Sequence, residues 1–222
     1  MTESSLRRST GIFGLVATLI SLTDIPLYFM YTGAPPQWDI LTRVLVGIVS
    51  STILIVFLVG FRLVICQERP QLEWSATLVL VSGLMWLTFS MVAQSMEAGT
   101  AIVSKIPIDP TVDGVLAPGQ FLLWGAIGRL MTTLFLSASG FAIWRGRLMP
   151  AWLAWLAFLI ALINLVFVPA MFFGYDAGQF YSAVGWGTTA MAPVLVVWWI
   201  IIASIILLRT PAKSEASPLV HG

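Results

Sequence analysis

Residues 184–208 read VGWGTTAMAPVLVVWWIIIASIILL and contain no charged side chain. The hydrocarbon core of a bilayer is about 30 Å thick, and a helix needs about 20 apolar residues to cross it. The stretch is long enough and is continuously apolar, whereas a strand of a membrane barrel would alternate between apolar and polar residues. We therefore expect residues 184–208 to cross a membrane as a helix.

Five further stretches have the same character, so the sequence predicts an all-α integral membrane protein with a bundle of six transmembrane helices. These stretches are Gly11–Tyr31, Val44–Cys66, Trp74–Met96, Phe121–Trp144 and Pro150–Phe173. The chain is 59% hydrophobic and 9% charged, whereas soluble domains carry about 25% charged residues. We expect a single transmembrane domain over residues 1–209, with an extracytoplasmic loop at 97–120 and a disordered cytoplasmic tail at 210–222.

The distribution of lysine and arginine predicts an orientation, because cytoplasmic connections carry an excess of positive charge. With the N-terminus in the cytoplasm, three cations fall in the outer half of the protein or beyond it: Arg43, Lys105 and Arg129. The others fall on the cytoplasmic side: Arg7, Arg8, Arg62, Arg69, Arg145, Arg147, Arg209 and Lys213. The sequence therefore predicts that both the N-terminus and the C-terminus are cytoplasmic.

Two charged residues are predicted to lie inside the hydrocarbon layer, where insertion of a charge costs at least about 2.5–3.5 kcal/mol. Asp24 lies about 20 Å along a helix that runs outward, and Arg129 lies about 13 Å along a helix that runs inward. Both positions fall in the outer third of the bundle. Because their depths match and their charges are opposite, Asp24 and Arg129 are candidates for an ion pair.

Other polar groups reach the same layer, and they predict a polar cavity that opens outward. Gln94 and Glu97 close the third helix, Asn164 lies in the outer half of the fifth, and Trp124 precedes Arg129. Prolines 26, 169 and 193 interrupt three helices in this layer and free backbone carbonyls. Three interpretations stay open: a structural Asp24–Arg129 pair, a ligand pocket, and a path for protons or ions.

Several chemistries are excluded by residues that the sequence lacks. Cys66 is the only cysteine and His221 the only histidine, so we expect no disulfide, no metal site and no histidine-based hydrolysis. Phosphate-binding and dinucleotide-binding glycine motifs are missing, so no cofactor is expected. No basic run of the kind that holds nucleic acid is present.

Residues 145–156, RGRLMPAWLAWL, begin with a basic turn and continue into an interfacial tryptophan anchor. This junction resembles the Arg-x-x-x-Leu-Pro-x-Trp-Leu-Gly-Trp-Leu pattern of small six-helix bacterial membrane proteins that are grouped as a domain-of-unknown-function family. Met149 is inserted before the proline, and Ala154 stands where glycine is usual. The resemblance implies a multi-pass protein of the bacterial plasma (inner) membrane and supplies no catalytic residues.

Two functions are compatible with the sequence. In the first, the protein binds or converts an apolar lipid or isoprenoid-like molecule. Asp24 and Glu97 would then be its catalytic acid and base. Arg129, Gln94, Asn164 and Trp124 would be its ligand-binding residues. In the second, the protein is a non-enzymatic subunit, sensor or small transporter, and the polar cluster is structural. Membrane lipids are the expected partners in both, and the sequence does not specify an oligomeric state.

Overall fold

A computed structural model describes residues 3–31 and 33–209, and this part of the chain is helical without strands. Six segments are long and apolar enough to cross a membrane, which confirms the prediction of an all-helical chain with six such helices. They are Ser4–Tyr28, Gln37–Glu68, Pro70–Val103, Ala117–Gly146, Ala151–Phe173 and Gly187–Arg209. The predicted tail at 210–222 and His221 lie outside the described residues.

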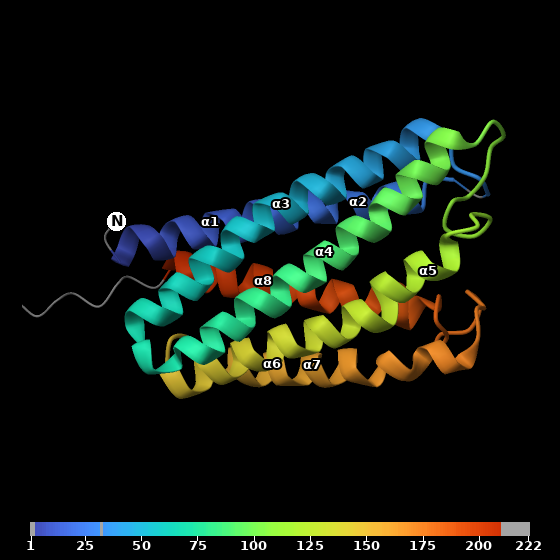
Figure 1. Cartoon of the computed structure of the whole chain (residues 1–222). Coiled ribbons are helices and arrows are strands. Elements are labelled where there is room, and N and C mark those ends of the chain that lie inside the picture. The colour runs from blue at the N-terminus through green and yellow to red at the C-terminus, as the bar shows by residue number, and fades with distance from the viewer. Residues whose placement is uncertain (1–2, 32, 210–222) are drawn as a thin grey trace, which may run out of the picture.

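The helices run side by side in one bundle (Figure 1), and their contacts close a ring in chain order. The α-helices are α1 (Glu3–Leu22), α2 (Asp24–Tyr28), α3 (Gln37–Glu68), α4 (Glu73–Val103), α5 (Ala117–Leu122), α6 (Gly128–Gly146), α7 (Ala151–Val166) and α8 (Ala192–Arg209). Short irregular helices are η1 (Pro70–Leu72), η2 (Leu123–Ile127), η3 (Val168–Phe173) and η4 (Gly187–Met191). Each long helix packs against the next one along the chain, and α8 packs against both α7 and α1. The ring therefore encloses an interior that all six segments can reach.

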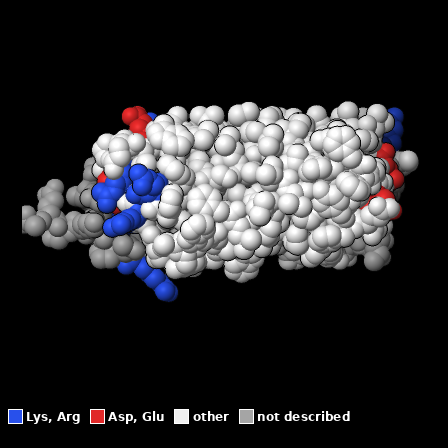
Figure 2. Space-filling model, turned by 90° about the horizontal axis from the view of Figure 1, so that it is seen from below, with Lys and Arg blue, Asp and Glu red and all other residues white. Residues whose placement is uncertain are grey.

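The two ends of the bundle differ in charge. We call the end where α1 begins and α8 ends the basic end, because seven described arginines gather there: Arg7, Arg8, Arg62, Arg69, Arg145, Arg147 and Arg209. The opposite end, which we call the loop end, holds the connections 33–36, 104–116 and 174–186. Figure 2 shows most of the blue side chains at one end, red ones at both ends, and an uncharged flank between them. This flank has the character of a surface that faces lipid.

At the loop end, two helix boundaries differ from the prediction by the most residues. The third span was predicted to end at Met96, but α4 continues to Val103, so Glu97 lies inside a helix and the loop covers residues 104–116 instead of 97–120. The second span was predicted from Val44, but α3 begins at Gln37. The prediction counted only the residues needed to cross lipid, whereas a helix continues until a proline or a turn ends it.

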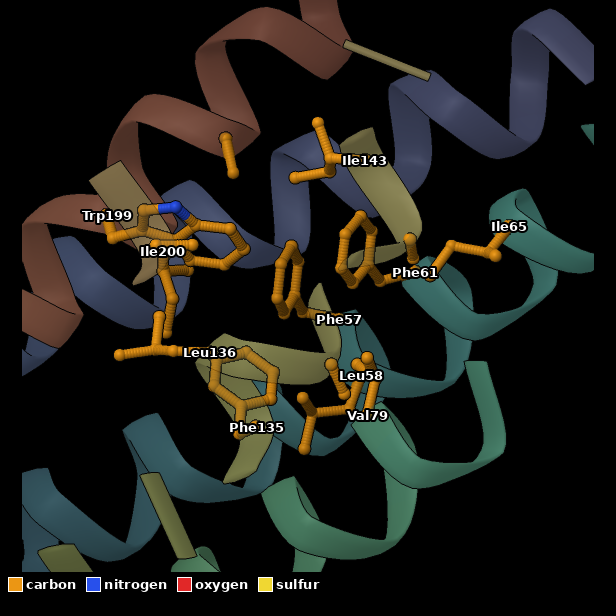
Figure 3. Close-up of a cluster of buried hydrophobic side chains, with 14 of the residues drawn as sticks. Phe57, Leu58, Phe61, Ile65, Val79, Phe135, Leu136, Ile143, Trp199 and Ile200 are labelled. Atoms are coloured by element: carbon orange, nitrogen blue, oxygen red, sulfur yellow. The ribbon is translucent and has the colours of Figure 1, made fainter. Parts of the chain in front are cut away.

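An apolar core fills the half of the ring nearest the basic end (Figure 3). Phe57 and Phe61 stack with ring centroids 5.6 Å apart, and Trp199 meets Phe135 edge to face at 5.8 Å. The indole nitrogen of Trp199 donates a hydrogen bond to the carbonyl of Leu153 at 3.2 Å, so its one polar group is satisfied. This half of the interior is closely packed, and it forms the floor for a polar region above it.

Candidate functional site

A cavity of about 110 Å³ lies inside the ring, between the apolar core and the loop end. Its apolar wall includes Leu54, Trp86 and Ile200. Its polar wall includes two opposite charges, Asp24 and Arg129, together with an amide and five hydroxyl groups: Gln94, Thr18, Ser21, Ser50, Ser51 and Ser90. A volume of this size admits several water molecules or one small polar group.

The helix that carries Asp24 is broken beside the cavity. α1 ends at Leu22 and α2 begins at Asp24, with Pro26 in its first turn. The hydroxyl of Thr23 donates a hydrogen bond to the carbonyl of Ile20 at 2.7 Å, which satisfies one of the acceptors at the end of α1. Asp24, the first residue of α2, lines the cavity directly after this break.

Two further spans are irregular where they reach the cavity. The π-type turn η2 contains Trp124 and a non-helical Gly125 (φ −77°, ψ −105°), and Arg129 follows in the first turn of α6. The second π-type turn, η4, leads into α8 at Pro193, which also lines the cavity. Irregular backbone is tolerated at membrane depth only where protein buries it or where it lines a cavity. Three such breaks therefore converge on one polar space.

Arg129 is buried, with 1% of its surface exposed, and all of its described partners are neutral. Nη1 donates to Asn164 Oδ1 at 3.2 Å, and Nη2 donates to the Trp124 carbonyl at 3.1 Å, whereas Nε has no hydrogen-bond partner. No carboxylate lies within 4.0 Å of the guanidinium among residues 3–31 and 33–209. Asn164 Oδ1 also accepts a hydrogen bond from Thr132 at 2.9 Å. The guanidinium is thus held rigidly beside the cavity with its charge uncompensated.

Asp24 is half-buried, and its Oδ1 is a buried oxygen without a hydrogen-bond partner. The candidate ion pair with Arg129 is not formed in the described structure. The charged neighbours that act on Asp24 are Arg43 and Asp39. Matching depth places two residues in one layer of the bundle, but it does not place them on facing sides. Asp24 and Arg129 share the cavity wall instead of neutralising each other.

A second polar group, which we call the Arg43 cluster, lies nearer the loop end and consists of Tyr28, Asp39, Arg43, Glu97 and Gln120. Arg43 Nε lies 3.2 Å from Asp39 Oδ2, and Nη2 lies 3.5 Å from Glu97 Oε1. The guanidinium also stacks 4.1 Å from the centre of the Tyr28 ring. Gln120 Nε2 donates to Glu97 Oε2 at 3.4 Å. This cluster joins α2, α3, α4 and α5.

The structure places the predicted site residues in three environments. Asp24, Gln94, Trp124 and Arg129 line the cavity, Asn164 supports Arg129 from behind, and Glu97 belongs to the Arg43 cluster. The assignment of Asp24 and Glu97 as an acid–base pair stays a prediction. In the described ranges, no group of three or more His, Cys, Asp or Glu residues could hold a metal ion.

Sequence reasoning missed the partners of Arg43 and the serines of the cavity. Asp39 and Arg43 have the i,i+4 spacing of a helical ion pair, and this signal was available in the sequence. Gly47, Ser50, Ser51 and Leu54 share one face of α3, and all four line the cavity. Their spacing of three and four residues could have identified a small, polar helix face.

The 104–116 loop is tied to the neighbouring connection at the loop end. The Tyr175 hydroxyl donates to the carbonyl of Thr111 at 3.1 Å. Partial burial, followed by the nearby Asp109 carboxylate, raises the pKa of Tyr175, so the phenol keeps the proton that it donates. Asp109 also accepts hydrogen bonds from the backbone and the hydroxyl of Thr111. The loop is therefore a defined element of the loop end.

Comparison with known proteins found no match to a family model, a curated protein or a solved structure.

Proposed function

We propose that this protein is a membrane-embedded binding protein whose cavity receives the polar group of an amphiphilic, lipid-like molecule. The observation that carries the proposal is that Asp24 and Arg129 both face the cavity without pairing with each other. An unpaired charge at membrane depth is costly, and such residues in known membrane proteins mark binding sites or transport pathways. A ligand that pairs with both charges would remove this cost.

The dimensions of the cavity support an amphiphile bound through its polar end. A space of about 110 Å³ is too small for a whole lipid, and its wall combines hydroxyl groups with apolar side chains. The outer surfaces of the spans are apolar, with exposed side chains such as Leu45, Val92 and Leu130. The apolar part of a ligand would therefore remain in the surrounding bilayer while its polar group occupies the cavity.

The proposal includes an orientation and a location. The excess of arginine at the basic end favours placing both termini in the cytoplasm of a bacterial cell, with the loop end outside the plasma membrane. The cavity lies on the loop side of the core, so its ligand would come from the outer leaflet.

Binding fits the geometry better than acid–base conversion does. Glu97 is engaged by Arg43 and Gln120 and is not part of the cavity wall. The alternative, a purely structural polar layer in a non-enzymatic subunit, sensor or small transporter, is favoured by the Arg43 cluster. That cluster connects four helices through its own contacts. It does not provide a partner for the free Nε of Arg129.

Native mass spectrometry of the protein purified in mild detergent tests the proposal. We expect the wild type to carry a bound amphiphile, and Ser50→Met to lose it because the larger side chain fills the cavity. Thr52→Met is the matched control, since Thr52 is an exposed residue two positions away on the same helix. A wild type without any bound molecule, or equal retention by both variants, would reject the binding function in favour of the structural one.

A further inference from the structure

The geometry points to a zwitterionic ligand group, with an anionic oxygen against Arg129 and a protonated amine against Asp24. This inference rests on the proposed binding function and names the chemistry of the group that the cavity takes. It follows from the unpaired polar atoms of residues that line the cavity and from the opposite charges of Asp24 and Arg129.

The anionic side of the ligand is indicated by Arg129. Nη1 and Nη2 each donate to one neutral acceptor, while Nε is buried without a hydrogen-bond partner. The residue itself lines the cavity. Hydrogen bonds between a guanidinium and a carboxylate or phosphate oxygen are about twice as strong as bonds between neutral groups. Asn164, Thr132 and the Trp124 carbonyl hold the side chain in place, so little order is lost when an anion binds.

The amine is indicated by unpaired acceptors. Asp24 Oδ1 and Gln94 Oε1 are both buried without hydrogen-bond partners, and both residues line the cavity. A primary ammonium has three N–H donors and can serve both acceptors. A quaternary ammonium has no donor and would leave both unsatisfied. Asp24 and Gln94 should therefore select a primary ammonium over a quaternary one.

Charge balance favours a ligand that is neutral overall. Asp24 and Arg129 carry opposite charges, so a zwitterion pairs with each of them and adds no net charge to the interior. A purely anionic ligand would leave Asp24 without a partner, and a purely cationic one would leave Arg129 without one. Burial of an unpaired charge is strongly unfavourable in a medium of low dielectric constant.

Two sources offer this chemistry: the headgroup of phosphatidylethanolamine, and a free neutral zwitterion such as glycerophosphoethanolamine, whose phosphodiester carries a single negative charge. We suggest incubating the detergent-purified protein with equal amounts of phosphatidylethanolamine, phosphatidylcholine and phosphatidylglycerol of matched acyl chains, and reading the bound fraction by native mass spectrometry. A parallel sample receives glycerophosphoethanolamine alone. Preference of about tenfold for phosphatidylethanolamine is expected, as one charge-assisted contact separates it from each competitor. Glycerophosphoethanolamine binding without lipid would instead assign the free zwitterion.

Two variants test the two contacts separately. Asn164→Asp places a carboxylate where Asn164 Oδ1 now lies 3.2 Å from Arg129, so it supplies an internal anion and should abolish binding of the zwitterion. Asp24→Asn should remove the selection for an amine, so that phosphatidylglycerol binds as well as phosphatidylethanolamine. Asp113→Asn, in the loop outside the cavity, should leave the preference unchanged. Melting temperature in detergent confirms that each variant is folded.

The outcomes distinguish this inference from the proposed function. A bound lipid without preference between ethanolamine and choline headgroups would overturn the amine contact while leaving amphiphile binding intact. Unchanged selection in Asp24→Asn would do the same. Retention by Asn164→Asp would overturn the contact with Arg129. If no probe binds to the wild type, both the inference and the proposed function fail.

Discussion

Arg43 on α3 lies 3.5 Å from Glu97 on α4, and it also holds Asp39 of its own helix at 3.2 Å. All three side chains are buried, with side-chain exposures of 5% for Arg43, 3% for Glu97 and 0% for Asp39. One guanidinium therefore serves two carboxylates, and its loss would leave both of them without a cation. Loss of the Glu97 charge should destabilise the protein less, because Asp39 remains as a partner for Arg43.

This asymmetry predicts the effect of replacing each member of the pair. Arg43→Met should destabilise the protein by about 3–5 kcal/mol, the cost of breaking a buried ion pair from one side. Glu97→Gln should cost less, and Glu97→Gln in the Arg43→Met background should recover part of the loss. The measurement is a double-mutant cycle of melting temperatures in detergent, with Arg62→Met, at a half-exposed ion pair, as control. Additive effects of the two replacements would contradict the pairing.

Close approach of α1 to the rest of the bundle predicts a strong effect of a single methyl group. A Cβ added at Gly14 would lie 2.7 Å from a ring carbon of Phe57 and would also collide with Ser204. Gly14→Ala should therefore destabilise the protein by about 1–3 kcal/mol through overpacking.

Gly99→Ala is the matched control for this prediction, because nothing lies within 4 Å of a Cβ at that position. Alanine is favoured over glycine in a helix, so this variant should be neutral or more stable. Thermal unfolding in the same detergent compares the two. Equal melting temperatures would show that α1 does not pack as closely as described.

The two acceptor roles of Asn164 predict that it stabilises the bundle. Its Oδ1 accepts hydrogen bonds from Arg129 and Thr132, and its Nδ2 donates to the Ile160 carbonyl. Asn164→Leu should cost about 1–3 kcal/mol, since buried donors lose their acceptor. Leu162→Ala changes an exposed residue on the same helix and should have little effect. A stable Asn164→Leu protein would mean that Arg129 finds another partner.

The orientation can be tested by labelling single cysteines in a Cys66→Ser background, because Cys66 is the only cysteine of the chain. Val112→Cys lies in the 104–116 loop, and Gln71→Cys lies in the turn at the basic end; both positions are exposed. A membrane-impermeant maleimide added to intact cells should label Val112→Cys, whereas Gln71→Cys should react only after permeabilisation. The reverse pattern would place the termini outside.

The polar layer shows where prediction from the sequence reached its limit. A helical rise of about 1.5 Å per residue is sufficient to place Asp24 and Arg129 at similar depths. Rotation around each helix decides which side chains face one another, and the breaks at Thr23 and Gly125 change that rotation. Arg43 meets Tyr28 and Glu97 on neighbouring helices for the same reason. Depth was predictable, but pairing was not.

The six spans and the contrast between a basic end and a less basic one follow from the sequence, because crossing a bilayer requires about 20 continuous apolar residues. These features depend on composition along the chain and need no knowledge of contacts. The division of the interior into an apolar core and a polar cavity was decided by the tertiary structure. The tertiary structure also decided that Asp24 and Arg129 do not pair. The division of the interior and this lack of pairing both depend on how six helices rotate and pack around a shared centre.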